Sequence, residues 1–339
     1  MDQYPETNSW LKPVEASLDM SKRVCIVTGA AGFIGSHLAD LLLESGWDVL
    51  ALDNLSLGRT ENLRSARQNS RFRFGIVDIN DTEACQRILQ PYGANAIEMI
   101  WHLAANSDIG AGVANPEVDL QNTFLSTFRL LGLAKQFGIP SFAFASSSAI
   151  YGVHHQPLTE DTGPLFPISN YGAMKLASEA AISAALETCL ERAWIFRFPN
   201  VIGPRATHGV IYDFIHKLRK NPKELLVLGD GRQEKPYLHV TELVEAMLFI
   251  VSHTQQKLNY FNIAPPDSTT SVRQIAETVV SVVAPDAVVC YGGGEKGWAG
   301  DVPKFSYNID KLLSLGWHPR LSSADAVQQA VREIAQEIS

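Results

Sequence analysis

The fold of this chain is decided by the stretch Thr28-Gly29-Ala30-Ala31-Gly32-Phe33-Ile34-Gly35, which lies between a predicted strand and a predicted helix. The strand is the apolar run Arg23–Thr28, and the helix is expected over Phe33–Ser45, with Gly46 at its end. Glycines at such a turn let the backbone approach a pyrophosphate, and the helix N-terminus supplies free N–H groups and the positive end of its dipole. The spacing GxxGxxG departs from the more common GxGxxG, so the turn indicates a dinucleotide site only together with its surroundings.

An acidic residue at the end of the next strand supports that site. The strand is predicted over Asp48–Leu52 and is followed by Asp53, whose carboxylate can accept hydrogen bonds from both ribose hydroxyls of adenosine. It would repel a 2′-phosphate, which favours NAD over NADP. The alternative is a solvated strand-end aspartate beside Arg59. Asp78, after the third strand, either contacts the adenine amino group or caps the helix that begins near Thr82.

Strand-like apolar runs alternate with helical stretches through the first 200 residues. This alternation predicts βαβ units and a Rossmann-type, doubly wound parallel sheet of the α/β class. Beyond Asn200 the elements become shorter and mix with Gly/Pro turns, which indicates a smaller C-terminal α/β substrate lobe. The other strands are expected at Phe72–Val77, Met99–Leu103, Ser141–Ala145 and Ala193–Arg197, and the helices at Gln121–Phe137, Tyr171–Glu191, Ile211–Lys220, Thr241–Ser252, Val272–Val283 and Ser323–Ile338.

The chain is therefore expected to have three parts. Residues 1–20 form a polar N-terminal arm that is expected to be mobile. Residues 21–200 form the NAD-binding Rossmann domain and carry the catalytic residues. Residues 201–339 form mainly the substrate-binding lobe, with some return to the Rossmann body.

Composition narrows the classes of function. A formal net charge of −8 argues against a broad surface for nucleic acid or anionic membrane. No run of about 18 apolar residues and no basic-then-apolar N-terminus is present, so neither a membrane span nor a secretory signal is expected. The four cysteines are widely spaced without a CxxC pair, which predicts reduced thiols, no metal site and a cytoplasmic location.

Tyr171 and Lys175 form a Tyr-x-x-x-Lys pair at the start of a predicted helix, a spacing that puts both side chains on one face. A free tyrosine has a pKa of about 10, and the neighbouring ammonium is expected to lower the pKa of Tyr171 so that it acts as a base. Lys175 can also hold a ribose hydroxyl of the nicotinamide half. Ser146, Ser147 and Ser148 follow a strand at the edge where ligands collect in open α/β sheets. Taken alone, the serines would be read as an ordinary polar turn.

At this point the chain resembles the extended short-chain dehydrogenase/reductase family, whose members include the UDP-galactose 4-epimerases and related nucleotide-sugar epimerases and dehydratases. The resemblance covers roughly residues 22–335 and is carried by many short motifs. They are Gly29–Gly35, Asp53-Asn54-Leu55, Val77-Asp78-Ile79, His102–Ala105, Asn122, Ser146–Gly152, Tyr171–Lys175, Arg197–Pro204, Gly229-Asp230-Gly231, Tyr237–Val240, Gly300-Asp301 and Leu315-Gly316-Trp317.

The resemblance implies a role for each matching position. Ser147, Tyr171 and Lys175 would be the catalytic residues, and His102 would be structural. The cofactor would contact Gly29, Gly32, Phe33, Ile34, Gly35, Asp53, Asn54, Asp78, Ile79, Leu103, Ala104, Ala105, Asn122, Tyr171, Lys175 and Pro199. The substrate, a nucleotide-diphosphate sugar, would contact Ser147, Ser148, Asn200, Lys235 and Asp301.

The residues after Ser147 indicate which reaction of the family to expect. The dehydratases and uronate decarboxylases that the chain resembles carry a glutamate two residues after the catalytic Ser or Thr, and dehydratases often have an aspartate before it. Here those positions are Ser148 and Ala149, so elimination is disfavoured. The expected reaction is NAD-dependent 4-epimerisation of a UDP-hexose, UDP-N-acetylhexosamine or UDP-hexuronate through a transient 4-keto sugar.

The sequence departs from the galactose epimerases at two positions that would bind the diphosphate of the substrate. The usual Arg-Asp pair before Tyr237 is replaced by Lys235 and Pro236, and a second arginine is replaced by Trp298. A lysine is a point charge and lacks the bidentate grip of a guanidinium. Arg205, Arg232 or Lys296 could replace the lost diphosphate contacts. Trp298 could stack on a base or sugar ring of the substrate, or belong to the core of the lobe. Asp108 is a further acid that contacts the sugar or caps the next helix.

Two other functions remain open on the sequence. One is a nucleotide-sugar reductase or dehydrogenase of the same fold, which Asp53 disfavours where NADPH is concerned. The other is a non-catalytic dinucleotide-binding protein, which the intact Tyr171 and Lys175 disfavour. Relatives commonly dimerise through two long helices per subunit, so the resemblance implies a homodimer formed by Gln121–Phe137 and Tyr171–Glu191.

Overall fold

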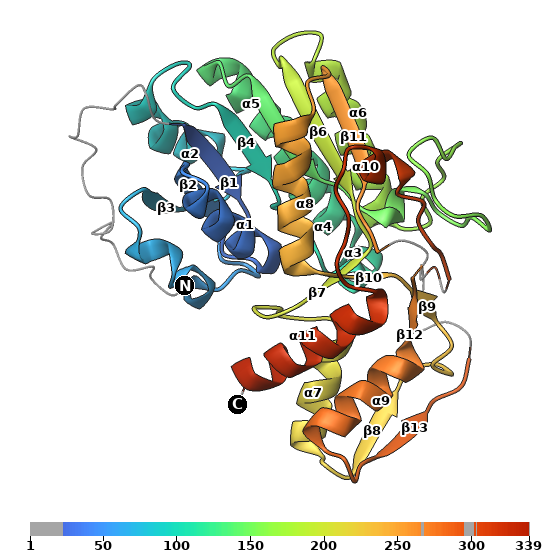
Figure 1. The fold of residues 1–339 in the computed structure, drawn as a ribbon. Helices are drawn as coiled ribbons and strands as arrows, with labels where there is room; N and C mark the ends of the chain where they lie inside the picture. The colour runs from blue at the N-terminus through green and yellow to red at the C-terminus, as the bar shows by residue number, and fades with distance from the viewer. Residues whose placement is uncertain (1–22, 266–267, 295–301, 303, 339) are drawn as a thin grey trace.

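A computed structural model describes residues 23–265, 268–294, 302 and 304–338 (Figure 1). The predicted N-terminal arm lies outside these residues. The centre of the molecule is a seven-stranded sheet in the order β11-β6-β5-β4-β1-β2-β3, with every pairing parallel. The strands are β1 Val24–Thr28, β2 Asp48–Asp53, β3 Phe72–Ile76, β4 Met99–His102, β5 Ser141–Ala145, β6 Arg192–Arg197 and β11 Leu258–Asn262. The order reverses between β1 and β4, which confirms the doubly wound α/β fold.

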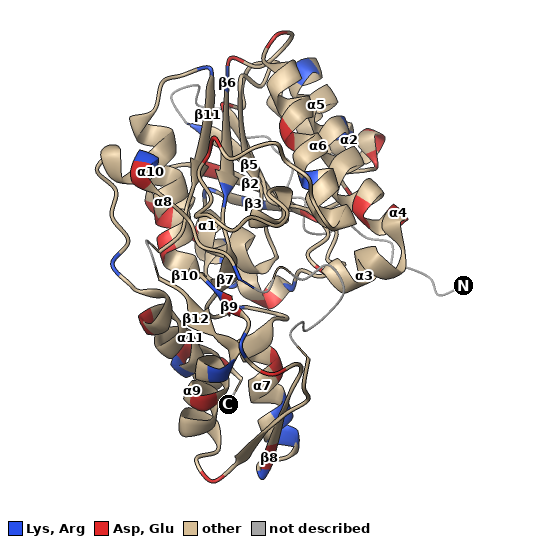
Figure 2. Cartoon of the chain, turned by 90° about the vertical axis from the view of Figure 1, so that its right-hand side faces the viewer, with Lys and Arg blue, Asp and Glu red and all other residues tan. Residues whose placement is uncertain are grey.

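Helices cover both faces of this sheet (Figure 2). The strands between them are apolar and nearly fully buried, as expected for a sheet covered on both sides. One core lies under α1 (Phe33–Glu44) and α8 (Val240–His253), and the other under α2 (Thr82–Leu89), α5 (Ser126–Phe137) and α6 (Asn170–Ala185). Thus α8 and β11, both beyond residue 200, belong to the Rossmann body.

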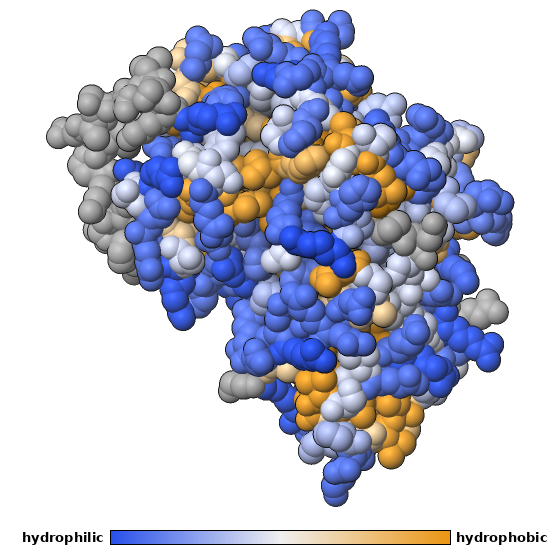
Figure 3. All heavy atoms as spheres, viewed as in Figure 1, coloured by the Kyte–Doolittle hydropathy of each residue, from blue (hydrophilic) through white to orange (hydrophobic). Residues whose placement is uncertain are grey.

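The smaller lobe has its own core, built on three further helices. These are α7 (Val210–Lys220), α9 (Val272–Val283) and α11 (Ser323–Glu337). Three two-stranded sheets accompany them: β7 (Asn200–Ile202) with β10 (Tyr237–His239), β9 (Glu234–Lys235) with β12 (Thr270–Ser271), and β8 (Glu224–Val227) with β13 (Val288–Tyr291). Apolar side chains gather at the lower end of the lobe in Figure 3, where Leu226 of β8 and Val288 of β13 are exposed.

The predicted helix Gln121–Phe137 is not one regular helix. The helical run begins at α4 (Pro116–Asp119), continues as a π-helical turn at Leu120–Leu125 and only then becomes α5. Hydroxyl groups compete for backbone carbonyls here: Ser126 Oγ donates to Asn122 O at 2.9 Å, and Thr127 Oγ1 donates to Thr123 O at 2.7 Å. The wider turn places Asn122 on the cavity described below.

The predicted helix Tyr171–Glu191 also ends early. Helix α6 stops at Ala185, whose carbonyl oxygen accepts bonds from the backbone N–H groups of Thr188, Cys189 and Leu190. Short connections complete the chain: α3 (Ile109–Ala114), α10 (Asp310–Ser314) and the 3-10 turns Thr60–Leu63, Ala66–Gln68, Gln90–Tyr92 and Ser148–Ile150. No helix within the described ranges is both long and apolar enough to cross a membrane.

Candidate active site

A cavity of about 890 Å³ lies between the carboxyl ends of the sheet strands and the small lobe. Strand ends in an open parallel sheet meet at one edge, so residues far apart in sequence are brought together there. Asp301 and the two lobe residues Lys296 and Trp298 lie outside the described residues. All the other predicted site residues line the cavity: Gly29, Gly32, Phe33, Ile34, Gly35, Asp53, Asn54, Asp78, Ile79, Leu103, Ala104, Ala105, Asn122, Ser147, Ser148, Tyr171, Lys175, Pro199, Asn200 and Lys235.

The glycine-rich turn has the geometry that a dinucleotide requires. Gly29 has a φ of 66°, and a Cβ there would lie 2.8 Å from the backbone nitrogen of Ala104. A Cβ at Gly35 would lie 2.1 Å from the carbonyl oxygen of Gly29. Helix α1 begins after Gly32 without a side-chain cap, so its first N–H groups face the cavity end where a pyrophosphate would sit. These residues fit NAD.

Asp53 is buried at the end of β2, with 7% of its surface exposed. Its Oδ2 accepts from Ala31 N at 2.9 Å, and its Oδ1 accepts from Leu55 N at 2.7 Å. Burial raises the pKa of this carboxyl against the lowering effect of those backbone donors. The solvated strand-end alternative is therefore wrong: the carboxylate braces the glycine turn and keeps further lone pairs for a ribose.

Asp78 is next to Asn54 at the adenosine end of the cavity. Asn54 Nδ2 donates to Asp78 Oδ2 at 3.2 Å, and Asp78 Oδ1 accepts from Asn80 N at 2.8 Å. The residue that caps α2 is Asp81, whose side chain accepts from Ala84 N at 2.9 Å. The capping alternative for Asp78 is therefore wrong, and the predicted contact with the cofactor stays a prediction for a residue that lines the cavity.

The predicted catalytic residues meet at the end of β5. Ser169 Oγ accepts from Gly172 N at 3.1 Å and so begins α6, whose first turn carries Tyr171 one turn before Lys175. Lys175 is buried, and its Nζ donates to the carbonyl oxygen of Ala145 at 2.6 Å. Tyr171 is half-buried on the cavity wall, which Ser147 also lines, and Ser147 is near enough to lower the pKa of the phenol. Strand and helix therefore present a hydroxyl, a phenol and an amine to one point.

The ionisation of this pair differs from the sequence expectation. Burial raises the pKa of Tyr171 to about 12, although the hydrogen bond from Ser147 lowers it. Burial also lowers the pKa of Lys175 to about 7, against the carboxylates of Glu179 and Asp119. The expected lowering of the Tyr171 pKa is therefore wrong for the protein alone, because desolvation outweighs the effect of Ser147 and the carboxylate of Asp119 raises the pKa further.

Two neighbours of the site have structural roles. His102 is fully buried, with Nδ1 at 2.7 Å from Thr28 Oγ1 and Nε2 at 3.0 Å from Thr127 Oγ1, and burial lowers its pKa to about 3. Its predicted structural role is confirmed. Asp108 lines the cavity but also caps α3, where its Oδ1 accepts from Ala111 N at 3.0 Å.

Of the predicted replacements for the missing diphosphate arginines, Lys296 lies outside the described residues, and the two arginines do not line the cavity. Arg205 pairs with Asp40 at 2.8 Å, and Arg232 has a side chain 85% exposed; neither lines the cavity. Lys235 lines it from β9, and Lys217 lines it from α7. Lys217 was missed by the sequence analysis, although the amphipathic pattern of α7 places it one turn after Asp213, a second cavity residue.

Comparisons with known proteins agree with this geometry. A UDP-galactose 4-epimerase crystal structure is 34% identical, has a TM-score of 0.82 and matches 93% of this chain and 100% of its own. A UDP-glucose 4-epimerase from Thermotoga maritima, solved with UDP-glucose, is 30% identical with a TM-score of 0.82 and the same coverage. UDP-glucuronic acid decarboxylase 1 of Arabidopsis thaliana is 28% identical over 323 residues, which are 92% of this chain and 70% of the relative.

The family model described as "NAD dependent epimerase/dehydratase family" matches residues 25–264. That segment holds the glycine turn, Asp53, Ser147 and the Tyr171–Lys175 pair, as well as the sheet that positions them. The chain therefore belongs to the NAD-dependent epimerase/dehydratase family.

Proposed function

We propose that this protein is an NAD-dependent UDP-sugar 4-epimerase. The observation that carries the proposal is the composition of one cavity. It holds Ser147, Tyr171 and Lys175 beside the NAD-fitting glycine turn, and no acid follows Ser147, where Ser148 and Ala149 stand. Without an acid at that position the site can move the C4 proton but lacks the residue that elimination of water would use there. Relatives that bind or act on UDP-sugars support the nucleotide.

The side chains divide the chemistry between them. Bound NAD would supply a hydride acceptor and donor at C4 of the sugar. Tyr171 Oη takes the proton of the C4 hydroxyl, and Ser147 Oγ hydrogen-bonds the same oxygen. Lys175 is held in place by its hydrogen bond to Ala145 O, and in its protonated form the lysine stabilises the phenolate of Tyr171. After the 4-keto sugar turns, Tyr171 returns the proton to the oxygen on the opposite face, and C4 is inverted.

The lobe supplies the substrate end of the cavity. Lys235 on β9 and Lys217 on α7 give it positive charge for a diphosphate, and Asn200 gives an amide. Lys217 Nζ donates to Leu226 O at 2.9 Å, which draws it toward β8. Two point charges can hold a diphosphate without the bidentate geometry of arginine. The hexose, N-acetylhexosamine and hexuronate forms of the substrate all satisfy this description.

The proposal is tested with purified protein and no added cofactor. UDP-hexoses, UDP-N-acetylhexosamines and UDP-hexuronates are supplied one at a time, and C4 configuration is followed by NMR. Interconversion of one C4 pair, with NAD retained and not consumed, is the expected result. Consumption of added NAD or NADH in step with product would instead identify the reductase or dehydrogenase alternative, and no turnover by NAD-loaded protein on any of these sugars would refute the epimerase.

We further propose a homodimer formed through the outer faces of α5 and α6. Phe128 on α5 has 59% of its surface exposed, and its ring centroid lies 6.1 Å from that of the partly buried Phe124, so an isolated subunit would leave the Phe128 side chain in water. The variant Phe128→Glu is expected to halve the mass measured by light scattering while the far-ultraviolet spectrum stays the same. An unchanged mass would exclude this face.

The four free cysteines fit a cytoplasmic location.

A further inference from the structure

Three consecutive residues at the end of β5 interact with three successive turns of α6. Ala145 O accepts from Lys175 Nζ, Ser146 Oγ donates to Glu179 Oε1 at 2.5 Å, and Ser147 is near enough to Tyr171 to lower the pKa of its phenol. The helix residues are spaced by four, so they form one stripe along α6 that faces the strand end. Tyr171 and Lys175 in this stripe belong to the proposed catalytic site, whereas Glu179 has not yet been given a role.

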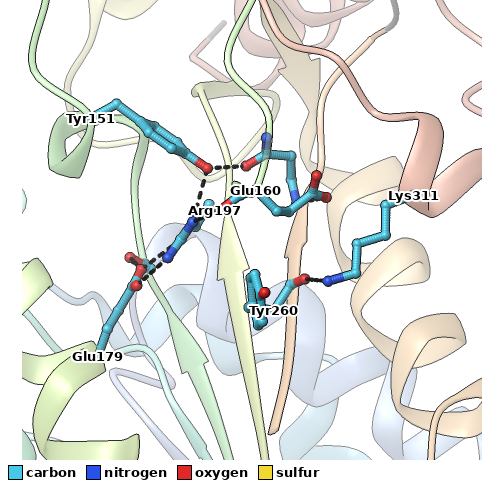
Figure 4. A network of polar contacts seen from close by, with 8 residues as sticks. Tyr151, Glu160, Glu179, Arg197, Tyr260 and Lys311 are labelled. Carbon is cyan, nitrogen blue, oxygen red and sulfur yellow. Dashed lines mark hydrogen bonds and ion pairs between the residues drawn. The ribbon is translucent and has the colours of Figure 1, made fainter. Parts of the chain in front are cut away.

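Glu179 is also held by Arg197 at the end of β6 (Figure 4). Arg197 donates from Nη2 to Glu179 Oε2 at 2.7 Å and from Nε to Oε1 at 3.1 Å, and both side chains are buried. Arg197 Nη1 also donates to Tyr151 Oη at 3.1 Å, and Tyr151 donates to Asn262 Oδ1 on β11 at 2.7 Å. Glu179 is thus fixed by bonds from β5 and β6.

We propose, on the basis of the epimerase function above, that Glu179 is a positioning residue: clamped by Ser146 and Arg197, it holds Lys175 as an ammonium and sets the register of Tyr171 against Ser147. Glu179 touches neither the reacting atoms nor the cavity, so it acts through Lys175. The clamp couples the rotation of α6 to the strand end that carries Ser147. An error of rotation would separate the phenol from the hydroxyl and reduce the rate without weakening substrate binding.

The charges around Lys175 support this role. The titratable groups that interact with it are Tyr171 and Glu179 on its own helix, Asp119 on α4 and His102 on β4. His102 is buried and neutral at pH 7, and the ring of Phe144 beneath the ammonium carries no charge. Burial lowers the pKa of Lys175, and of the two carboxylates that oppose it Glu179 has the larger effect.

The test uses the NAD-loaded enzyme with 13C at the ε-carbon of lysine, and the Lys175 signal is assigned by its loss in a Lys175→Arg protein. Glu179→Gln keeps the shape and one acceptor oxygen but removes the charge. We expect the Lys175 titration to move down by about one pH unit, since a nearby opposite charge changes a pKa by roughly that amount or more. The kcat profile should move with it while KM stays near the wild-type value.

Glu160→Gln is the matched control. Glu160 is a buried carboxylate of the same network that accepts from Asn262 N at 2.8 Å, so its loss also weakens the fold but leaves the Lys175 titration unchanged. If Glu179→Gln does not fold, Ser146→Ala leaves the charge but removes one of the two hydrogen bonds to Oε1, and a smaller downward shift with lower kcat is expected. A Lys175 titration that is the same in wild type and in the folded Glu179 or Ser146 variant would overturn the proposal. The titration needs no substrate, so its outcome is independent of whether the protein epimerises UDP-sugars.

Discussion

At the scale of single residues, Gly35 shows how little space the cofactor turn leaves. A Cβ at this position would lie 2.1 Å from Gly29 O and 2.8 Å from Gly29 C, both backbone atoms that cannot move aside alone. Gly35→Ala is therefore expected to release NAD, measured by absorbance of the supernatant after denaturation, and to lower the melting temperature. Gly132→Ala on α5, where a Cβ meets nothing within 4 Å, is the control and should retain NAD with a helix stabilised by up to about 1 kcal/mol.

His102 gives the molecule a specific response to acid. Its pKa of about 3 in the folded protein lies below the ordinary value of about 6.5, so between these values only the unfolded chain binds the proton. Stability must then fall as pH drops from about 6.5 toward 3, by at most about 1.4 kcal/mol per pH unit from this group. We expect the gap in unfolding free energy between wild type and His102→Asn, measured in urea, to be largest at pH 7 and smaller at pH 4.5. A gap that widens on acidification would contradict this.

At the scale of elements, the stability of the first turn of α6 is expected to affect the catalytic rate, because that turn carries Tyr171. Ser169 caps the helix two residues before Tyr171, and its loss leaves the Gly172 N–H unsatisfied. Ser169→Ala is expected to cost about 1 kcal/mol and to lower kcat several-fold, since the first turn that carries Tyr171 would fray. Ser271→Ala removes a capping box from α9 in the lobe and should cost about as much stability with no change in kcat. Equal kcat losses in both variants would show that global stability, not the position of Tyr171, is responsible.

Elements set by local pattern were predictable, and those set by tertiary contacts were not. The strands Ser141–Ala145 and Asp48–Asp53 and the helix Val272–Val283 follow directly from apolar runs and periodicity. The π-helical turn at Leu120–Leu125 depends on hydroxyl groups that bond its backbone carbonyls. One of them belongs to another helix: Ser178 Oγ on α6 donates to Thr123 O at 3.3 Å. Such a contact has no local signal in the sequence.

In the candidate site, too, features set by the local sequence pattern were predictable and those set by tertiary contacts were not. Residue types at strand ends identified the cavity wall, because the edge of a parallel sheet is fixed by the strand pattern. The pKa of Tyr171 was wrongly predicted because burial depends on everything that surrounds the pair. Glu179 was overlooked although it lies four residues after Lys175, since only the structure brings Arg197 and Ser146 to it.

At the scale of the whole molecule, the substrate is expected to bridge two bodies with separate tasks. The Rossmann body supplies Tyr171, and the lobe supplies Lys235 from a strand that pairs with β12. Lys235→Ala should raise KM roughly tenfold at nearly unchanged kcat, because a charge-assisted contact is worth about 1.5–3 kcal/mol in binding, and Lys235→Arg should restore or lower KM. Arg232→Ala, which removes an exposed cation just before the strand that carries Lys235, is the control with no expected change. A fall in kcat with constant KM for Lys235→Ala would contradict this division.

The position of β11 also matters while the chain is being made. This strand completes the sheet by pairing with β6, yet 60 residues of chain, including most of the strands of the lobe, separate Arg197 from Leu258. A nascent chain released only as far as residue 200 carries β6 as an open edge with unpaired N–H and C=O groups. During synthesis that edge stays uncovered until the intervening residues have left the ribosome, which at roughly 5–20 residues per second takes several seconds. Truncated forms that stop between the two strands should therefore aggregate or be held by chaperones, and the NAD-binding half should not be separable from the rest of the protein by cutting the chain near residue 200.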